Sequence, residues 1–124
     1  MSALLVVDSA NVVGSVPDGW WRDRRGAAIR LRDRIAAWAA AGERAPFRDA
    51  PEVVLVVEGA ARDVGSVPGV RVERAAGSGD DTIVDVVAAR TPGRRCVVVT
   101  ADRELRSRVT ALGAEVAGPS VLQP

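Results

Sequence analysis

Carboxylate side chains follow several apolar runs of this sequence, at positions where they could share one site. Asp8 ends the run at residues 4–7, Asp80 and Asp81 follow Gly77-Ser78-Gly79, and Asp102 lies shortly after the run at residues 96–99. Glu58 follows the run at residues 53–57 and is interpreted as an ordinary loop carboxylate. Clustered carboxylates repel one another unless a cation neutralises them, and Mg²⁺ and Mn²⁺ prefer such oxygen ligands. The pattern predicts a Mg²⁺ or Mn²⁺ site suited to metal-assisted phosphodiester hydrolysis.

Other kinds of active site are excluded by composition. The chain of 124 residues has no His, no Tyr and one Cys. Ser-His-Asp and Cys-His catalysis and zinc sites that need His or paired Cys are therefore ruled out. The phosphate-binding pattern G-x-x-x-x-G-K-[ST] is also absent. If the protein is an enzyme, carboxylates are the residues expected to do its chemistry.

Three polar residues could support this acidic site. Asn11 could hold the turn after Asp8 or hydrogen-bond its carboxylate, Thr100 precedes Asp102, and Asp85 lies one helical turn after Asp81. Each acid also has a purely structural interpretation, because Asp is a common helix N-cap and is favoured at the positive end of a helix. Asp8 fits that interpretation least well, since a charge that ends a buried strand needs a partner.

The segment after the first apolar run could contact a polyanion. It contains a Trp pair and several basic side chains. Arg guanidinium groups bind phosphate, and Trp rings stack on unpaired bases. The alternative is that one Trp anchors the segment to the core and that the Arg residues form a solvated face. The candidate substrate-binding residues are Trp20, Trp21, Arg22, Arg24 and Arg25.

The elements that would position these residues alternate between strands and helices. Unbroken β-branched runs at residues 4–7, 53–57 and 96–99 are typical of strands buried on both faces, and weaker strands are predicted at 70–73 and 114–117. Apolar stripes predict helices over 28–38, which Gly42 would end, over 80–91, and between Asp102 and Gly113. Residues 12–25 are expected to form a long connection.

This order predicts an α/β fold with a central, mostly parallel sheet. We expect one domain over residues 1–124, because neither a repeat nor a second domain is evident. The net charge of +1 gives no global argument for a nucleic acid or a membrane. Without a signal peptide or an apolar run long enough to span a bilayer, and with a single Cys, the chain is expected to be cytoplasmic and not to bind membranes.

Three motifs in this order resemble a known family. The stretches LLVVDSANVVGSVPDGWW, GSGDDTIVDVV and VVVTADRELRSRV resemble the NYN domains, in particular the YacP-like branch of the PIN-like nuclease superfamily. The similarity extends from about residue 4 to residue 116. It implies a three-layer α/β/α fold and a Mg²⁺- or Mn²⁺-binding acidic site in a protein that cleaves single-stranded or structured RNA.

By position, the resemblance implies functional roles for Asp8, Asn11, Asp80 or Asp81, Thr100 and Asp102. The chain departs from the family at Val84, where an acidic residue is expected. The resemblance therefore leaves open whether the site holds one metal ion or two. We interpret the chain as a metal-dependent ribonuclease in which Asp8, Asp81 and Asp102 act with help from Asp80. The alternatives are a catalytically inactive RNA- or nucleotide-binding module and a small partner-binding domain, and a homodimer is possible.

Overall fold

The computed structural model describes residues 2–41 and 47–122 of the chain. Its centre is a five-stranded sheet in the order β3-β2-β1-β4-β5, and every pair of neighbouring strands is parallel. The strands are β1 (Leu4–Asp8), β2 (Glu52–Val57), β3 (Val70–Arg74), β4 (Cys96–Val99) and β5 (Glu115–Ala117). All five strands expected from the sequence are confirmed.

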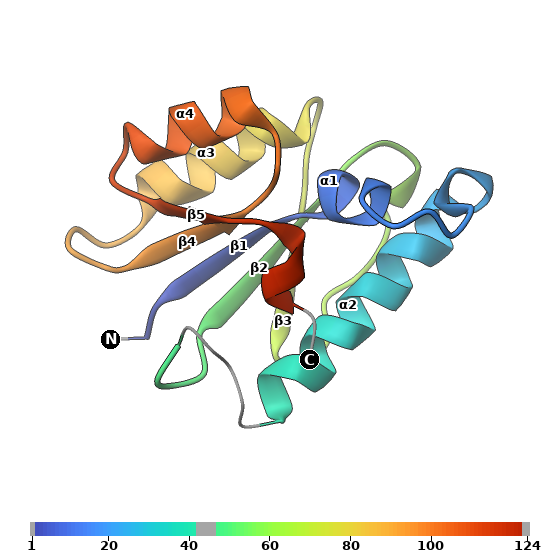
Figure 1. Cartoon of the computed structure of the whole chain (residues 1–124), viewed down its shortest axis with the longest axis horizontal. Helices are drawn as coiled ribbons and strands as arrows, with labels where there is room; N and C mark the ends of the chain where they lie inside the picture. The colour runs from blue at the N-terminus through green and yellow to red at the C-terminus, as the bar shows by residue number, and fades with distance from the viewer. Residues whose placement is uncertain (1, 42–46, 123–124) are drawn as a thin grey trace.

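Helices cover both faces of the sheet, and the strand side chains alternate between two apolar cores (Figure 1). Leu5 and Val7 of β1 face the core beneath α1 (Ser9–Gly14) and α2 (Arg24–Ala40). Leu4 and Val6 face the core beneath α3 (Gly79–Ala89) and α4 (Arg103–Thr110). Because both faces of the inner strands β1, β2 and β4 are buried, these strands are apolar at successive positions, whereas the edge strands β3 and β5 include charged residues. The expected three-layer α/β/α fold is confirmed.

The helix expected over 28–38 is α2, which begins earlier than its apolar stripe. Asp23 caps it by accepting a hydrogen bond from the Gly26 backbone N–H at 2.9 Å. Arg24 and Arg25 therefore belong to the first turn of the helix rather than to a loop. Gly42, the expected end of this helix, lies outside the described residues.

The prediction that residues 12–25 form a long connection is wrong in its first part. The six residues of α1 follow β1 without a gap, and Asp8 caps the helix. Val12 and Val13 are buried against α2, so packing stabilises a helix too short to show an apolar stripe in the sequence. A 3₁₀ turn, η1 (Trp20–Arg22), then leads into α2.

The remaining elements complete the sheet and its cover. The two later predicted helices are confirmed as α3 and α4, which Ser78 and Asp102 cap. Two more 3₁₀ turns follow β2 and β5, namely η2 (Gly59–Ala61) and η3 (Pro119–Leu122). Among the described helices, none is long and apolar enough to cross a membrane.

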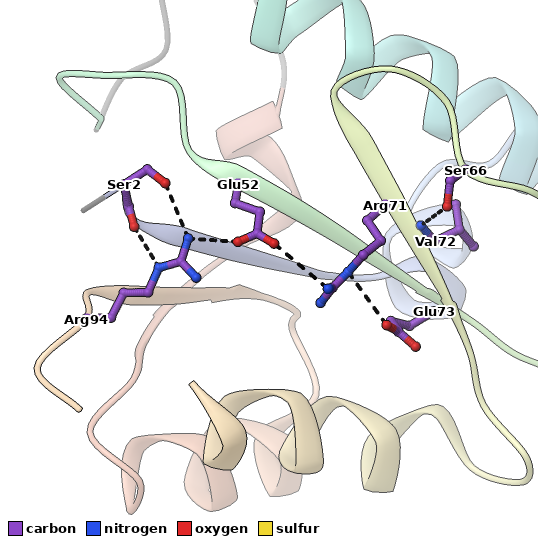
Figure 2. Close-up of polar contacts among 7 residues, drawn as sticks. All are labelled: Ser2, Glu52, Ser66, Arg71, Val72, Glu73 and Arg94. Atoms are coloured by element: carbon purple, nitrogen blue, oxygen red, sulfur yellow. Dashed lines mark hydrogen bonds and ion pairs between the residues drawn. The ribbon is translucent and has the colours of Figure 1, made fainter. Parts of the chain in front are cut away.

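A chain of polar contacts joins the strands near their amino ends (Figure 2). Arg94, just before β4, donates to the Ser2 backbone carbonyl at 2.7 Å and to the Glu52 carboxylate at 2.8 Å. Glu52 also faces Arg71 of β3 at 3.9 Å, and Arg71 faces Glu73 at 3.6 Å. Arg94 thus links the starts of β1, β2 and β4.

Replacing Arg94 should destabilise the fold more than replacing its neighbour. The Arg94 side chain is only 15% exposed and has several acceptors, so Arg94→Ala should lower the free energy of unfolding by about 1–2 kcal/mol. Arg95 forms an ion pair with Glu115 in which both side chains are about half exposed, and its guanidinium lies over the Phe47 ring at 5.2 Å. Because both contacts are at the surface, Arg95→Ala should cost at most about 1 kcal/mol. Urea unfolding of both variants tests this, and equal losses would contradict it.

Candidate active site at the carboxyl ends of β1 and β4

The acidic residues lie where the strand order reverses. From β1 the chain proceeds to β2 and β3 on one side, and then returns to β4 and β5 on the other. In open parallel sheets, ligands bind outside the carboxyl ends of the strands at such a switch point. Asp8 is the last residue of β1, and Thr100 directly follows β4. The topology therefore brings together residues that are 92 positions apart in the sequence.

Asp8 is buried, with 6% of its surface exposed. The Thr100 hydroxyl donates to Asp8 Oδ2 at 2.9 Å, and the Asn11 backbone N–H approaches Oδ1 at 3.4 Å. Burial raises the pKa of Asp8 to about 6, although these hydrogen bonds oppose the shift; the charges of Asp80 and Glu58 raise it further. Asp8 is thus a carboxylate held in an environment that disfavours its charge.

Asn11 and Thr100 connect the two turns on either side of the switch point. Asn11 Oδ1 accepts a hydrogen bond from the Ala101 backbone N–H at 2.8 Å, which ties α1 to the turn after β4. The buried Thr100 hydroxyl, besides donating to Asp8, accepts one from the Asp102 backbone N–H at 3.1 Å. Both residues lie beside Asp8 as expected, and the contacts show that they orient the acidic turns.

Asp102 caps α4, so its structural interpretation is correct. Its Oδ1 accepts a hydrogen bond from the Leu105 backbone N–H at 2.9 Å. Its charge also raises the pKa of Asp80, a group on another helix. A cap and a site residue are compatible, because capping occupies one of the two carboxylate oxygens.

The two adjacent acids of α3 have different surroundings. Ser78 caps the helix, so Asp80 is not needed for capping. Partial burial raises the pKa of Asp80, with further contributions from Asp102 and Glu58, whereas Arg108 lowers it. Asp81 is 73% exposed on its side chain and accepts a hydrogen bond from Arg108 of α4 at 3.0 Å. Asp80, rather than Asp81, therefore shares the electrostatic environment of Asp8.

Glu58 is part of this acidic edge, so its interpretation as an ordinary loop carboxylate is wrong. It follows β2, and its Oε2 accepts a hydrogen bond from the Gly79 backbone N–H at 2.6 Å. A Cβ at residue 79 would lie 3.3 Å from the Glu58 carboxylate, so Gly79 permits this close approach. Glu58 thus fixes the start of α3 and contributes negative charge beside Asp8 and Asp80.

Asp85 does not extend the acidic edge. It lines a hollow with Leu4 and Glu52, near the amino ends of β1 and β2. The physical reason is the rise of the helix, because four residues advance the chain by about 6 Å along its axis, back toward the starts of the strands.

The acids can be compared with what a metal ion requires. Among residues 2–41 and 47–122, no group of three or more His, Cys, Asp or Glu side chains is close enough to enclose a metal ion. Mg²⁺ commonly keeps several waters and uses only one or two carboxylates, so a closed cage is not required. Asp8 and Asp80, whose charges are costly here, have donor chemistry that fits a largely hydrated Mg²⁺ or Mn²⁺ ion.

The Trp and Arg residues lie on one side of this edge. Trp20 packs partly buried against the core, whereas Trp21 is 54% exposed and meets Trp20 edge to face at 6.0 Å between ring centroids. Arg22 lies over the Trp21 ring and Arg24 over the Trp20 ring, at 5.8 and 5.3 Å. Arg25 instead pairs with Asp63. The anchoring interpretation therefore applies to Trp20, while Trp21 and Arg22 face solvent.

These features define an open, doubly wound α/β fold with acidic residues at its switch point. Its fold is similar to that of Rae1 (YacP) from Bacillus subtilis: the identity is 20%, the TM-score is 0.74, and the alignment covers 98% of this chain and 71% of that one. The W164L mutant of Rae1 gives 17% identity and a TM-score of 0.69, with coverage of 97% and 72%. No protein-family model matches the sequence, and no curated protein matches it. The resemblance to YacP-like proteins is thus supported at the level of the fold.

Removing the Asp8 charge should stabilise the protein at neutral pH. The folded-state pKa of about 6 exceeds the ordinary value of 3.8, so stability is lost as the pH rises between these values. The shift in pKa corresponds to about 3 kcal/mol. Because Asn offers one acceptor oxygen in place of two to Thr100 and Asn11, Asp8→Asn in a chelating buffer at pH 7.5 should raise the free energy of unfolding by about 1–2 kcal/mol.

Below pH 3.8 the Asp8 carboxyl is protonated in both the folded and the unfolded protein, so the stabilisation by Asp8→Asn should disappear near pH 3.5. Urea unfolding at the two pH values measures it, and Asp85→Asn at an exposed position serves as the control. A loss of stability for Asp8→Asn at pH 7.5 would contradict the expectation.

Proposed function

We propose that this protein is a metal-dependent ribonuclease that hydrolyses phosphodiester bonds at the switch point between β1 and β4. The observation that carries the proposal is the buried Asp8 carboxylate, which is held by Thr100 and has a raised pKa. Strongly perturbed carboxylates beside other acids are typical of functional sites. The fold similarity to Rae1 (YacP) supports the same class of protein.

Asp8, Asp80 and Asp102 are the residues that would hold Mg²⁺ or Mn²⁺, directly or through water. Bound there, the ion would supply activation of water and stabilisation of charge on the attacked phosphate. Asp80 takes the principal role that the interpretation of the sequence gave to Asp81, because it is Asp80 whose charge acts on Asp8. The pairing of Asp81 with Arg108 suits it to holding α3 against α4.

The chain's own polar contacts keep these acids in place. Thr100 and Asn11 orient Asp8 and join its turn to that of Asp102, while Glu58 fixes the backbone that precedes Asp80. Catalytic groups must be held within fractions of an ångström by supporting hydrogen bonds. We assign Asn11, Thr100 and Glu58 this positioning role.

RNA is the proposed substrate because cationic and aromatic side chains adjoin the acidic edge. Arg22 and Arg24 have no carboxylate partner among the described residues, and both lie against Trp rings. Such pairs contact both the backbone and the bases of a nucleic acid strand. The segment Trp20–Arg25 would guide the strand toward Asp8.

Neutralising the acids one at a time tests the nuclease proposal. Asp8→Asn, Asp80→Asn and Asp102→Asn should each reduce Mn²⁺-dependent cleavage of labelled RNA at least about 100-fold, because each removes a charge from the metal site. Asn retains the cap at position 102. Asp81→Asn should lose less of the cleavage activity than Asp80→Asn, and Asp85→Asn should cleave RNA at the wild-type rate.

Chelation of divalent ions should abolish the wild-type cleavage, and excess Mn²⁺ should restore it. Circular dichroism of each variant separates loss of activity from loss of fold. Full activity in Asp8→Asn and Asp102→Asn, or in excess chelator, would overturn the proposal.

The second candidate is a catalytically inactive RNA- or nucleotide-binding module. It is favoured by Val84, which replaces an expected acid, and by the lack of a close group of three metal-ligating side chains among residues 2–41 and 47–122. RNA binding that is indifferent to Mn²⁺ and produces no cleavage would identify this function.

A further inference from the structure

A groove beside the acidic edge has no function assigned so far. One wall is formed by α1 and the start of α2, with Ser9, Trp20 and Arg24, and the facing wall by the turn after β2, with Glu58 and Ala60. Its volume of about 340 Å³ lies at the small end of the range for ligand pockets. Because Ser9 follows Asp8 directly in the chain, the groove opens next to the proposed reaction centre.

The walls suit a flat, uncharged ring better than a phosphate group. The Trp20 ring and small apolar side chains line most of the groove, and Arg24 lies over the same ring at 5.3 Å. Glu58 stands on the opposite wall, where its carboxylate would repel a phosphate but accept a hydrogen bond from a base N–H. Trp rings stack on any base, because every base has a π-face.

The groove is built from elements whose positions are fixed. Trp20 packs against the core and contacts Trp21 edge to face, so its ring is held rather than free. On the facing wall, Gly59 has φ +58°, a left-handed conformation in which glycine avoids strain, and Glu58 is anchored to Gly79. A groove that is already formed binds a base without the entropic cost of ordering its walls.

We propose that this groove binds one unpaired nucleobase of the RNA, next to the phosphodiester at Asp8, so that the protein prefers single-stranded RNA to duplex. Identification of the ligand as RNA rests on the proposed function. A paired and stacked base has no free face, whereas an unpaired base can enter and stack on the Arg24 guanidinium that covers the Trp20 ring, while Arg22 contacts the backbone of the strand. The preference for unpaired RNA would thus arise from shape and stacking rather than from net charge.

Binding in the absence of cleavage tests the groove separately from the chemistry. A fluorescent single-stranded oligoribonucleotide and the same strand annealed to its complement are titrated with protein in chelating buffer, and anisotropy is recorded. Wild type should bind the single strand at least about 10-fold more tightly than the duplex. Trp20→Ala should weaken single-strand binding about 10-fold, within the range known for base stacking, and Trp20→Phe should recover most of the affinity.

A variant that fills the groove avoids disturbing the core. Ala60 is exposed, so Ala60→Leu should narrow the groove without changing stability and should weaken single-strand binding about 10-fold. Ala37→Leu, at an exposed position of α2 outside the groove, is the matched control and should bind like wild type. Thermal unfolding checks that all variants are folded.

The outcomes separate this proposal from the nuclease proposal. Wild-type affinity in Ala60→Leu, or equal affinity for single strand and duplex, overturns the base-binding groove even if the protein cleaves RNA. Conversely, a protein that fails to cleave RNA but loses single-strand affinity in Ala60→Leu and Trp20→Ala retains the groove and loses only the nuclease assignment.

Discussion

The hydrogen bond from the Thr100 hydroxyl to the Asp8 carboxylate is the contact on which the candidate site depends. It joins the ends of β1 and β4, the two strands between which the order of the sheet reverses. Both residues are buried, so an unpaired carboxylate would be costly there and the hydroxyl satisfies one of its oxygens. Asn11 and the backbone of Asp102 extend the same contact into α1 and α4. The position of each acidic turn is therefore coupled to that of the others.

This arrangement concentrates negative charge where the fold places ligands. Asp8 and Asp80 both have raised pKa values, because burial and neighbouring acids disfavour their ionised forms. A protein gains nothing in stability from such a cluster, and removal of the Asp8 charge is expected to stabilise the fold. Retention of destabilising charges at a switch point is the pattern expected when function rather than stability determines the residues.

The near-zero net charge conceals how the charges are distributed. The acids gather at the carboxyl ends of the strands, whereas Arg22 and Arg24 lie on the adjoining turn and helix against Trp rings. Glu58 belongs to both regions, because it fixes the start of α3 and forms one wall of the groove opposite Trp20. The proposed base-binding groove and the acidic edge are thus built on one shared residue. We expect binding of the strand and placement of its phosphate to be linked for that reason.

The sequence by itself determined the strands, the longer helices and the edge of the sheet at which the candidate site lies. Unbroken β-branched runs are distinctive of buried parallel strands, and an Asp that ends such a run is conspicuous because burial of its charge requires a partner. The sequence did not reveal α1, whose six residues are too few for an apolar stripe and are stabilised by packing against α2. Nor could it distinguish Asp80 from Asp81, because neighbouring helix residues point in different directions that only the packing of α3 against α4 and the sheet defines.

The same limit applies to Asp85 and Glu58. The spacing placed Asp85 on the same helix face as Asp81, but it did not show near which end of the strands Asp85 would lie. In the structure Asp85 lines a hollow with Leu4 and Glu52, near the amino ends of β1 and β2. Glu58 follows β2 without a motif around it, and its importance comes from a contact with Gly79, 21 residues away. Local patterns determined which segments become strands and helices, since those depend on neighbouring residues. The tertiary structure decided which acids meet, because that depends on the order of strands in the sheet.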